Sequence, residues 1–196
     1  MNICGRDIRA RLIMLLCVLP ALPPLRSAFE ASMAMLMLGL LPSLFAAGCL
    51  APSLVVRRCR VRASRAVRPY ALALLAGASL AYGLWMLPVA IDLSRMLPSL
   101  AVARDLSVLL AGLASVAAVR VAPWPLVLFF GGNMVWMGLT FGMLFIDAQT
   151  RLCANYLLGD QRLAGAGLAL YAFALGVWLM AWVAQRAQAS GRASNR

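Results

Sequence analysis

The sequence of 196 residues contains no histidine and no lysine, and only 12% of its residues are charged. Without histidine, a Ser-His-Asp triad, a histidine general base and every histidine-containing metal site are excluded. The cysteines are odd in number and form no C-x-x-C pair, so neither a disulfide framework nor a zinc site follows; they are Cys4, Cys17, Cys49, Cys59 and Cys153. P-loop, dinucleotide-binding and nucleophile-elbow motifs are also missing. The sequence therefore offers no recognisable catalytic constellation, and we expect a protein that is not an enzyme.

Apolar residues are abundant instead, at 64% of the chain. A soluble domain of this size is roughly half apolar and a quarter charged, so both an ordinary soluble domain and a disordered chain are excluded. The net charge of +12 comes entirely from arginine. Because the arginines lie between long apolar runs and no basic, aromatic-laced soluble face exists, the charge favours a lipid bilayer as partner and argues against nucleic acid.

Long runs without charge predict an all-α, polytopic membrane bundle. A span needs about 20 apolar residues, and four charge-free runs are long enough: residues 31–56, 69–91, 121–146 and 163–185. A fifth helix is expected over residues 97–119, with Arg104 and Asp105 in its first third. Residues 12–25 are a sixth candidate, giving about six helices in one domain (residues 1–186), followed by a polar, frayed cytoplasmic tail (residues 187–196). The first run also has the pattern of a signal peptide, and cleavage near Ser27 and Ala28 would leave five.

The arginines in the connecting segments predict the orientation. With both termini in the cytoplasm, thirteen of the eighteen arginines lie inside, four lie outside, and Arg104 lies within a span. This excess on one side is the usual bias of cytoplasmic loops, and six of the thirteen fall in the single segment from Arg57 to Arg68. We therefore expect a multi-pass protein of a bacterial inner membrane.

Five of the six carboxylates then gather toward the outer side: Glu30, Asp92, Asp105, Asp147 and Asp160. Acidic residues need no function to lie outside, because they contribute little to topology. Asp105 is the exception, since a carboxylate in hydrocarbon costs about 3 kcal/mol and usually faces the bundle interior. It either pairs with an arginine from another helix, stays protonated, or lies at the interface. Arg104, about 100° away on the helix, is expected to snorkel outward rather than face Asp105.

Small residues at four-residue spacing predict close helix packing. The pairs are Gly138 with Gly142, Gly77 with Ala81, and Ala172 with Gly176. Methionines gather toward the outer side as well, and their thioethers are soft donors that suit Cu(I). Met33 and Met37 share one helix face while Met35 points away. The alternative for all of them is simple packing by a flexible apolar side chain.

One segment resembles a known family. The run Asp160-Gln161-Arg162-Leu163-Ala164-Gly165 is similar to the D-Q-x-L-(A/G)-G motif of the CtaG family, membrane-embedded assembly factors of haem-copper cytochrome c oxidase. Trp85-Met86-Leu87-Pro88 is similar to that family's W-H-x-P. The run from Leu106 to Gly112 is similar to its H-L-S-F-x-x-A-G, and the run from Met33 to Leu44 to its H-M-x-x-H-x-L-L. The stretches follow the family order over most of residues 30–178.

The resemblance implies oxidase assembly or copper delivery, but the family histidines are replaced. Met86 stands where W-H-x-P has histidine, and Asp105 stands before the L-S pair. A surviving copper site would therefore use Met33, Met86 and Asp105, and loss of metal binding is the alternative. The resemblance also makes Asp160, Gln161, Gly165, Trp85 and Pro88 candidate motif residues, with Asp160 expected to cap the helix that it precedes. A non-enzymatic accessory subunit of a larger membrane complex is the second hypothesis.

Overall fold

The computed structural model describes residues 12–54, 63 and 65–194, with the side chains of the last helix only as far as Arg186. The described residues form helices and turns and no strand. Five helical stretches are long and apolar enough to cross a membrane, and a sixth is possible if a bent pair near the N-terminus forms one span. The prediction of an all-α membrane bundle is confirmed.

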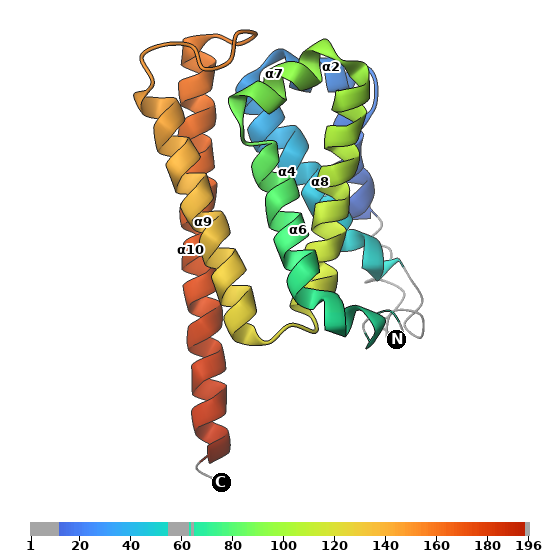
Figure 1. Ribbon diagram of the computed structural model, residues 1–196, viewed down its shortest axis with the longest axis vertical. Helices are drawn as coiled ribbons and strands as arrows, with labels where there is room; N and C mark the ends of the chain where they lie inside the picture. Colours follow the sequence, from blue (N-terminus) through green and yellow to red (C-terminus); the bar gives the residue numbers. More distant parts are fainter. Residues whose placement is uncertain (1–11, 55–62, 64, 195–196) are drawn as a thin grey trace.

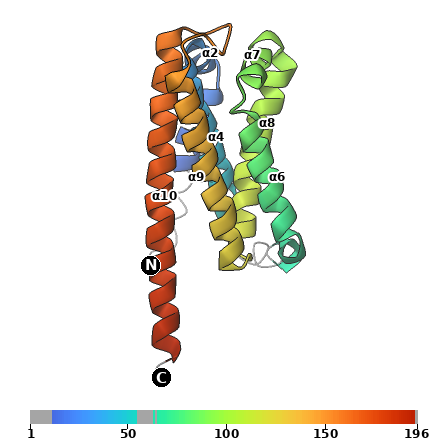
Figure 2. The same ribbon diagram turned by 60° about the vertical axis from the view of Figure 1, so that its left-hand side comes forward.

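The five long stretches follow the apolar runs of the sequence. The first, Met33–Ser53, combines α3 (Met33–Met35), a π-helical turn η2 (Leu36–Leu40), α4 (Leu41–Leu50) and η3 (Ala51–Ser53). The others contain α6 (Ala71–Leu84) after η4 (Arg68–Tyr70), α8 (Pro98–Val119), α9 (Trp124–Asp147) and α10 (Leu158–Ser194). Helices α4, α6 and α8 form one group, and α9 packs along α10 as an antiparallel pair (Figures 1 and 2).

Two short helices lie together at one end of the bundle. They are α2 (Leu25–Ala31) and α7 (Pro88–Met96), and the loop from α9 to α10 crosses the same end (Figure 1). We call it the α2–α7 end. The turn from α8 to α9 and the last turns of α10 lie toward the opposite end. The carboxylates expected on the outer side therefore belong to elements that meet at the α2–α7 end.

Prolines explain where helices begin and break. The predicted span over residues 69–91 is wrong in its second part, because α6 ends at Leu84 and α7 starts at Pro88. Proline has no N–H and forces the preceding residue into extended backbone, and Leu87 has φ −73° and ψ 129°. Near the N-terminus, the segment Leu12–Ala21 is bent by 64° against Leu25–Ala31, in a region containing Pro20, Pro23 and Pro24.

The last helix also extends beyond the predicted span, since α10 continues to Ser194 and so includes most of the tail that was expected to be frayed. Residues 187–194 contain three alanines, a glutamine and an arginine and no proline. These five are strong helix formers, and they outnumber the two serines and the glycine of the segment, so the backbone can extend the preceding span. Polarity alone marks the end of an apolar span but not the end of a helix.

Glycines bring two helix pairs into close contact. A Cβ at Gly142 would lie 2.9 Å from the Gly165 carbonyl oxygen, and one at Gly138 would lie 2.8 Å from the Ala172 Cβ, which confirms G-x-x-x-G packing of α9 on α10. The tighter contact joins α4 to α8: a Cβ at Gly48 would lie 2.0 Å from the Leu109 carbonyl oxygen. Gly77, by contrast, has no atom within 4 Å of such a Cβ, so its predicted packing role is wrong.

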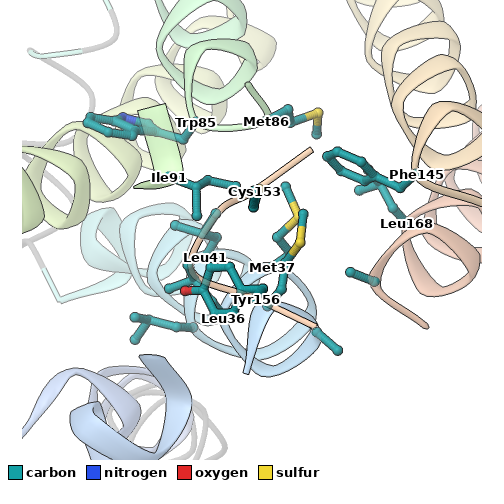
Figure 3. Packing of buried hydrophobic residues seen from close by; sticks show 14 of the residues in the cluster. Leu36, Met37, Leu41, Trp85, Met86, Ile91, Phe145, Cys153, Tyr156 and Leu168 are labelled. Carbon is teal, nitrogen blue, oxygen red and sulfur yellow. The ribbon is translucent and has the colours of Figure 1, made fainter. Parts of the chain in front are cut away.

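The main core lies beneath the α2–α7 end. Its buried side chains come from the first span, the α6–α7 turn, α7, α8, α9, α10 and the α9–α10 loop, and they include Met37, Met86, Ile91, Phe145 and Cys153 (Figure 3). A smaller cluster of Ala71, Leu75 and Ala118 joins α6 to α8, with Phe130 of α9 packed against it. Segments far apart in sequence are thus held together most firmly at the α2–α7 end.

Candidate functional site: a charged cluster and a shared cap at one end of the bundle

Arg104 is the most unusual residue of this end, because its side chain is completely buried. Its Nη2 lies 2.7 Å from Glu30 Oε1 and 2.9 Å from Asp105 Oδ1. Its Nε also donates to Asp105 Oδ1 at 3.0 Å, and Nη1 donates to Ser94 Oγ at 3.0 Å. The prediction that Arg104 snorkels outward and cannot face Asp105 is wrong. A long, flexible arginine can bend back over its own helix when carboxylates of α2 and α8 supply its partners.

Asp105 also pairs with a second arginine. Its Oδ2 lies 2.9 Å from Nη2 of Arg26, which belongs to α2. Of the alternatives left by the sequence, pairing with an arginine from another helix is the one found in the structure. Arg26 closes the cluster through Glu30, one helical turn later, with Nε 3.1 Å from Oε1. Two guanidinium groups therefore face two carboxylates, and the formal charges of this four-residue cluster balance.

The cluster has an outer layer made of α7 and the α9–α10 loop. Arg95 Nη1 and the Tyr156 hydroxyl both donate to the Glu30 carbonyl oxygen, the latter at 3.2 Å. The Arg95 guanidinium lies over the Tyr156 ring at 5.0 Å from its centroid. Burial raises the pKa of the Tyr156 phenol, and the nearby guanidiniums of Arg95 and Arg104 oppose that rise, so the hydroxyl remains a donor. These contacts attach the C-terminal half of the chain to α2.

Trp85 reaches the same cluster from the turn after α6. Its indole Nε1 donates to Ser107 Oγ at 2.7 Å, and that hydroxyl donates to the Arg104 carbonyl oxygen at 2.9 Å. Trp85 is buried, so it does not belong to an exposed aromatic belt at the membrane interface. Pro88 begins α7 and its carbonyl oxygen lies 3.8 Å from the Cys153 sulfur. Both residues help to join the α6–α7 turn to its neighbours.

Asp160 forms a cap across the bundle. It lies in the first turn of α10, yet its carboxylate accepts hydrogen bonds from the backbone N–H groups of Met33 and Ala34, at the start of α3. Ser32 Oγ donates to Asp160 Oδ1 at 2.7 Å and accepts from the Met35 N–H at 3.3 Å. The expectation that Asp160 caps its own helix is wrong, because the helix that it caps is α3 and not α10. The carboxylate satisfies N–H groups of a helix 127 residues earlier while still lying near the positive end of the α10 dipole.

Gln161, the second residue of the motif, fixes the α9–α10 loop. Its buried side chain accepts from the Leu152 N–H at 2.9 Å through Oε1 and donates from Nε2 to the Phe145 carbonyl oxygen at 3.3 Å. Gly165, one turn later, packs its backbone against Gly142, where a Cβ would lie 2.6 Å from the carbonyl oxygen. The motif residues Asp160, Gln161 and Gly165 thus hold α10 to the first span, the loop and α9.

Asp92 of α7 holds the same loop from its other side. Its carboxylate accepts from the Ala154 N–H at 2.8 Å and from the Asn155 side-chain amide at 3.3 Å. Cys153 directly precedes Ala154 and is buried. Burial, together with the negative charge of Asp92, raises the pKa of the Cys153 thiol from 9.0 to about 12. The thiol is therefore neutral and unreactive at physiological pH.

The methionines divide into buried and exposed sets. Met33, Met37 and Met86 belong to the main core, whereas Met35, Met96 and Met143 are exposed. The prediction that Met33 and Met37 share a face and Met35 points away is confirmed. Of the three candidate copper ligands, Met33 and Met86 share the apolar cluster, while both carboxylate oxygens of Asp105 face arginines. Among the described residues, no group of three histidine, cysteine or acidic side chains is arranged to hold a metal.

Sequence reasoning missed the partners rather than the position of the cluster. Arg26 and Glu30 carry one local signal, their i,i+4 spacing, which marks a pair on one helix face. Ser94 carries no signal, because its contact with Arg104 depends on how α7 lies against α8. Comparison with protein families, with curated proteins and with solved structures finds no match for the chain.

Proposed function

We propose that this chain is a non-enzymatic, multi-pass protein of a bacterial inner membrane that acts in the assembly of a haem-copper cytochrome c oxidase. The proposal rests on the resemblance of its motifs to those of the CtaG family. The α2–α7 end is the working surface in this proposal, and it faces outward. Both termini are cytoplasmic, as the arginine excess predicts.

One observation supports this proposal most directly: the four stretches that carry the resemblance meet at the α2–α7 end. Trp85 bonds to Ser107 and so joins the W-M-L-P stretch to the L-S-V-L-L-A-G stretch. Asp160 bonds to Ser32 and Met33 and so joins the D-Q motif to the start of the first span. Two of these contacts are direct hydrogen bonds between stretches that are separate in the sequence. Direct hydrogen bonds between them are expected if the motifs are parts of one inherited architecture.

The three candidate ligands Met33, Met86 and Asp105 are poorly arranged to bind copper. Thioethers suit Cu(I), and Met33 and Met86 lie in one buried cluster, but Asp105 already has two arginine partners. Binding a cation at Asp105 would break these ion pairs and leave the buried Arg104 undercompensated, which is costly. The proposed function therefore assigns no step to a bound metal, and the role is that of a scaffold for the assembling oxidase.

An accessory subunit that packs permanently against a larger membrane complex is the alternative. It is favoured by the way the charged cluster is used: Glu30, Arg104 and Asp105 serve as one another's partners and so stabilise the bundle itself. Stoichiometric co-purification with a complex would support the accessory subunit. Transient association during oxidase biogenesis would support the assembly factor.

The decisive experiment deletes the gene from its source bacterium and measures terminal oxidase activity and the copper-to-haem ratio of the purified oxidase. We expect both to fall and to recover with the wild-type gene. Trp85→Phe, which removes the bond to Ser107 but keeps an aromatic ring, is a milder variant that should complement partly while inserting normally. An unchanged oxidase in the deletion strain would overturn the assembly role and direct attention to stable partners.

The orientation has its own test. Cys59 lies outside the described residues, in the arginine-rich segment that we assign to the cytoplasm. In a variant that keeps Cys59 as its only cysteine, a membrane-impermeant maleimide should label inverted vesicles and leave intact spheroplasts unlabelled. Labelling of intact spheroplasts would reverse the topology and place the α2–α7 end in the cytoplasm.

A further inference from the structure

Asn133 is a polar residue near the middle of a membrane span whose hydrogen-bonding groups are only partly satisfied among the described residues. It is the tenth of the 24 residues of α9, so it lies only about 4 Å along the helix from the midpoint at 1.5 Å per residue. Its side chain is exposed. Among the described residues, the amide makes one hydrogen bond, a weak N–H···S contact to Met137 at 3.4 Å. The Oδ1 atom accepts none from that part of the chain.

The neighbouring polar residue on this face does not share the problem. Thr140 donates its hydroxyl to the Trp136 carbonyl oxygen, 2.9 Å away, and is satisfied within its own helix. A carboxamide has two donor hydrogens and an acceptor oxygen, and α9 gives it one soft acceptor. Hydrocarbon offers no replacement, so an exposed asparagine at this depth is costly unless another helix supplies a partner.

The face that carries Asn133 points away from α10 and lies beside the contact of α9 with α6, where Met137 packs against Gly83. Helix α9 uses its small residues Gly138 and Gly142 against α10. At 100° per residue, Asn133, Phe129 and Trp136 lie on the opposite side of the helix from Gly138. Phe129 and Trp136 are 68% and 71% exposed. The result is an apolar, aromatic stripe with one carboxamide near its middle, on the side of α9 that faces away from α10.

We propose that this stripe, formed by Phe129, Asn133 and Trp136, is the interface of a homodimer in which α9 packs against α9 of a second copy. The partner must present both a donor and an acceptor near the bilayer midplane. A second copy meets that requirement, because an asparagine near a two-fold axis can donate to and accept from its own symmetry mate. Two-fold, isologous dimers are also the commonest oligomers, and their interfaces are self-complementary in this way. Interhelical hydrogen bonds from asparagine are a recognised source of association in membranes.

The dimer is independent of the proposed assembly role. Its interface belongs to α9 alone, and the charged cluster and the D-Q cap lie elsewhere. A failure of the dimer would leave the deletion experiment untouched, and an unaffected oxidase would leave the dimer untouched.

The first test is crosslinking in native-like bilayers. In a background with all five native cysteines replaced, Trp136→Cys should form a disulfide-linked dimer on mild oxidation. The matched control is Phe173→Cys on α10, which is 65% exposed and lies at a similar depth, since its neighbour Ala172 packs on Gly138. It should remain monomeric. Equal crosslinking at both positions, or a Trp136→Cys adduct with a protein of different mass, would overturn the proposal.

The second test measures affinity directly. The dimer dissociation constant is obtained from fluorescence transfer between labelled full-length copies in vesicles, as the lipid-to-protein ratio is raised. Asn133→Leu should raise the constant about 5- to 30-fold, as expected for one interhelical polar contact. Asn133→Gln, which keeps the carboxamide, should recover part of the loss. A wild-type chain that is monomeric at all ratios, or a constant unchanged by Asn133→Leu, would refute the homodimer.

Discussion

Ser32 and Asp160 together cap the start of α3, and Ser32 Oγ donates a hydrogen bond to Asp160 Oδ1 at 2.7 Å. A helix usually finds its cap in its own preceding residue. Here the serine supplies one acceptor and the aspartate, from the last helix, supplies the others. The first and last spans of the bundle are therefore joined through backbone groups that no local residue satisfies alone.

Asp160→Ala should destabilise the protein by about 1–2 kcal/mol, because the N–H groups of Met33 and Ala34 lose their acceptor. The measurement is the free energy of unfolding in mixed detergent micelles. Asp147→Ala is the matched control, since that exposed carboxylate makes no hydrogen bond or ion pair within the part of the chain that the structure describes. Equal losses in the two variants would contradict the shared cap.

Arg104→Met should cost about 3–5 kcal/mol, because it leaves the Glu30 and Asp105 carboxylates with Arg26 alone. Adding Asp105→Asn to this variant should recover part of the loss, since one partly buried negative charge is then removed as well. Arg162→Met is the control, as Arg162 is exposed. The same unfolding assay applies, and a loss below about 1 kcal/mol would mean that the cluster is solvated rather than structural.

Gly112→Ala should separate α4 from α8. An added Cβ would lie 2.1 Å from the Phe45 carbonyl oxygen, a backbone atom that cannot rotate away. We expect destabilisation of about 1–3 kcal/mol, as for other overpacked sites. Gly77→Ala is the opposite case, because nothing lies within 4 Å of its added Cβ, and it should stabilise α6 by about 0.5–1 kcal/mol through helix propensity. Thermal unfolding in detergent compares the two, and a similar response would contradict the close α4–α8 contact.

Cys153 should resist alkylation. Its pKa rises from 9.0 to about 12, so at pH 8 the thiolate fraction in the folded protein is roughly a thousandth of that in the unfolded chain. In a variant that keeps only this cysteine, we expect a slow reaction with N-ethylmaleimide. Adding Asp92→Asn to that variant should make the reaction faster, because the substitution weakens the loop contacts and removes the nearby charge. Rapid labelling at pH 8 would show that the loop is open.

The raised pKa of Cys153 also predicts how stability changes with pH: it should fall as the pH rises above 9. The neutral thiol is favoured in the folded state, so the unfolded chain loses its proton first as pH rises above 9. The contribution of Cys153 to stability is therefore complete below pH 9 and is lost as pH rises toward about 12. Replacement by serine should remove that part of the alkaline decline, which a stability titration between about pH 8 and 11 can detect.

The sequence predicts the fold well because the bilayer demands long apolar helices, and each such run leaves a mark that needs no knowledge of its neighbours. The candidate site is different. Arg104 and Asp105 are visible as charges in a span, but their partners lie on α2, a short helix that hydropathy does not distinguish from a flank. The close α4–α8 contacts at Gly48 and Gly112 come from glycines that have no second glycine four residues away in their own helices. Such features depend on which helix faces which, and that is set by packing rather than by composition.

The residues of the buried charged cluster are also synthesised in a particular order. Glu30 precedes Arg104 by 74 residues, and Arg26 precedes it by more. Because synthesis starts at the N-terminus, Glu30 and Arg26 leave the ribosome before Arg104 does. Arg104 and Asp105 then enter as adjacent opposite charges, and their partners Glu30 and Arg26 have already been synthesised. We therefore expect α2 to offer ion-pair partners to α8 as soon as α8 inserts.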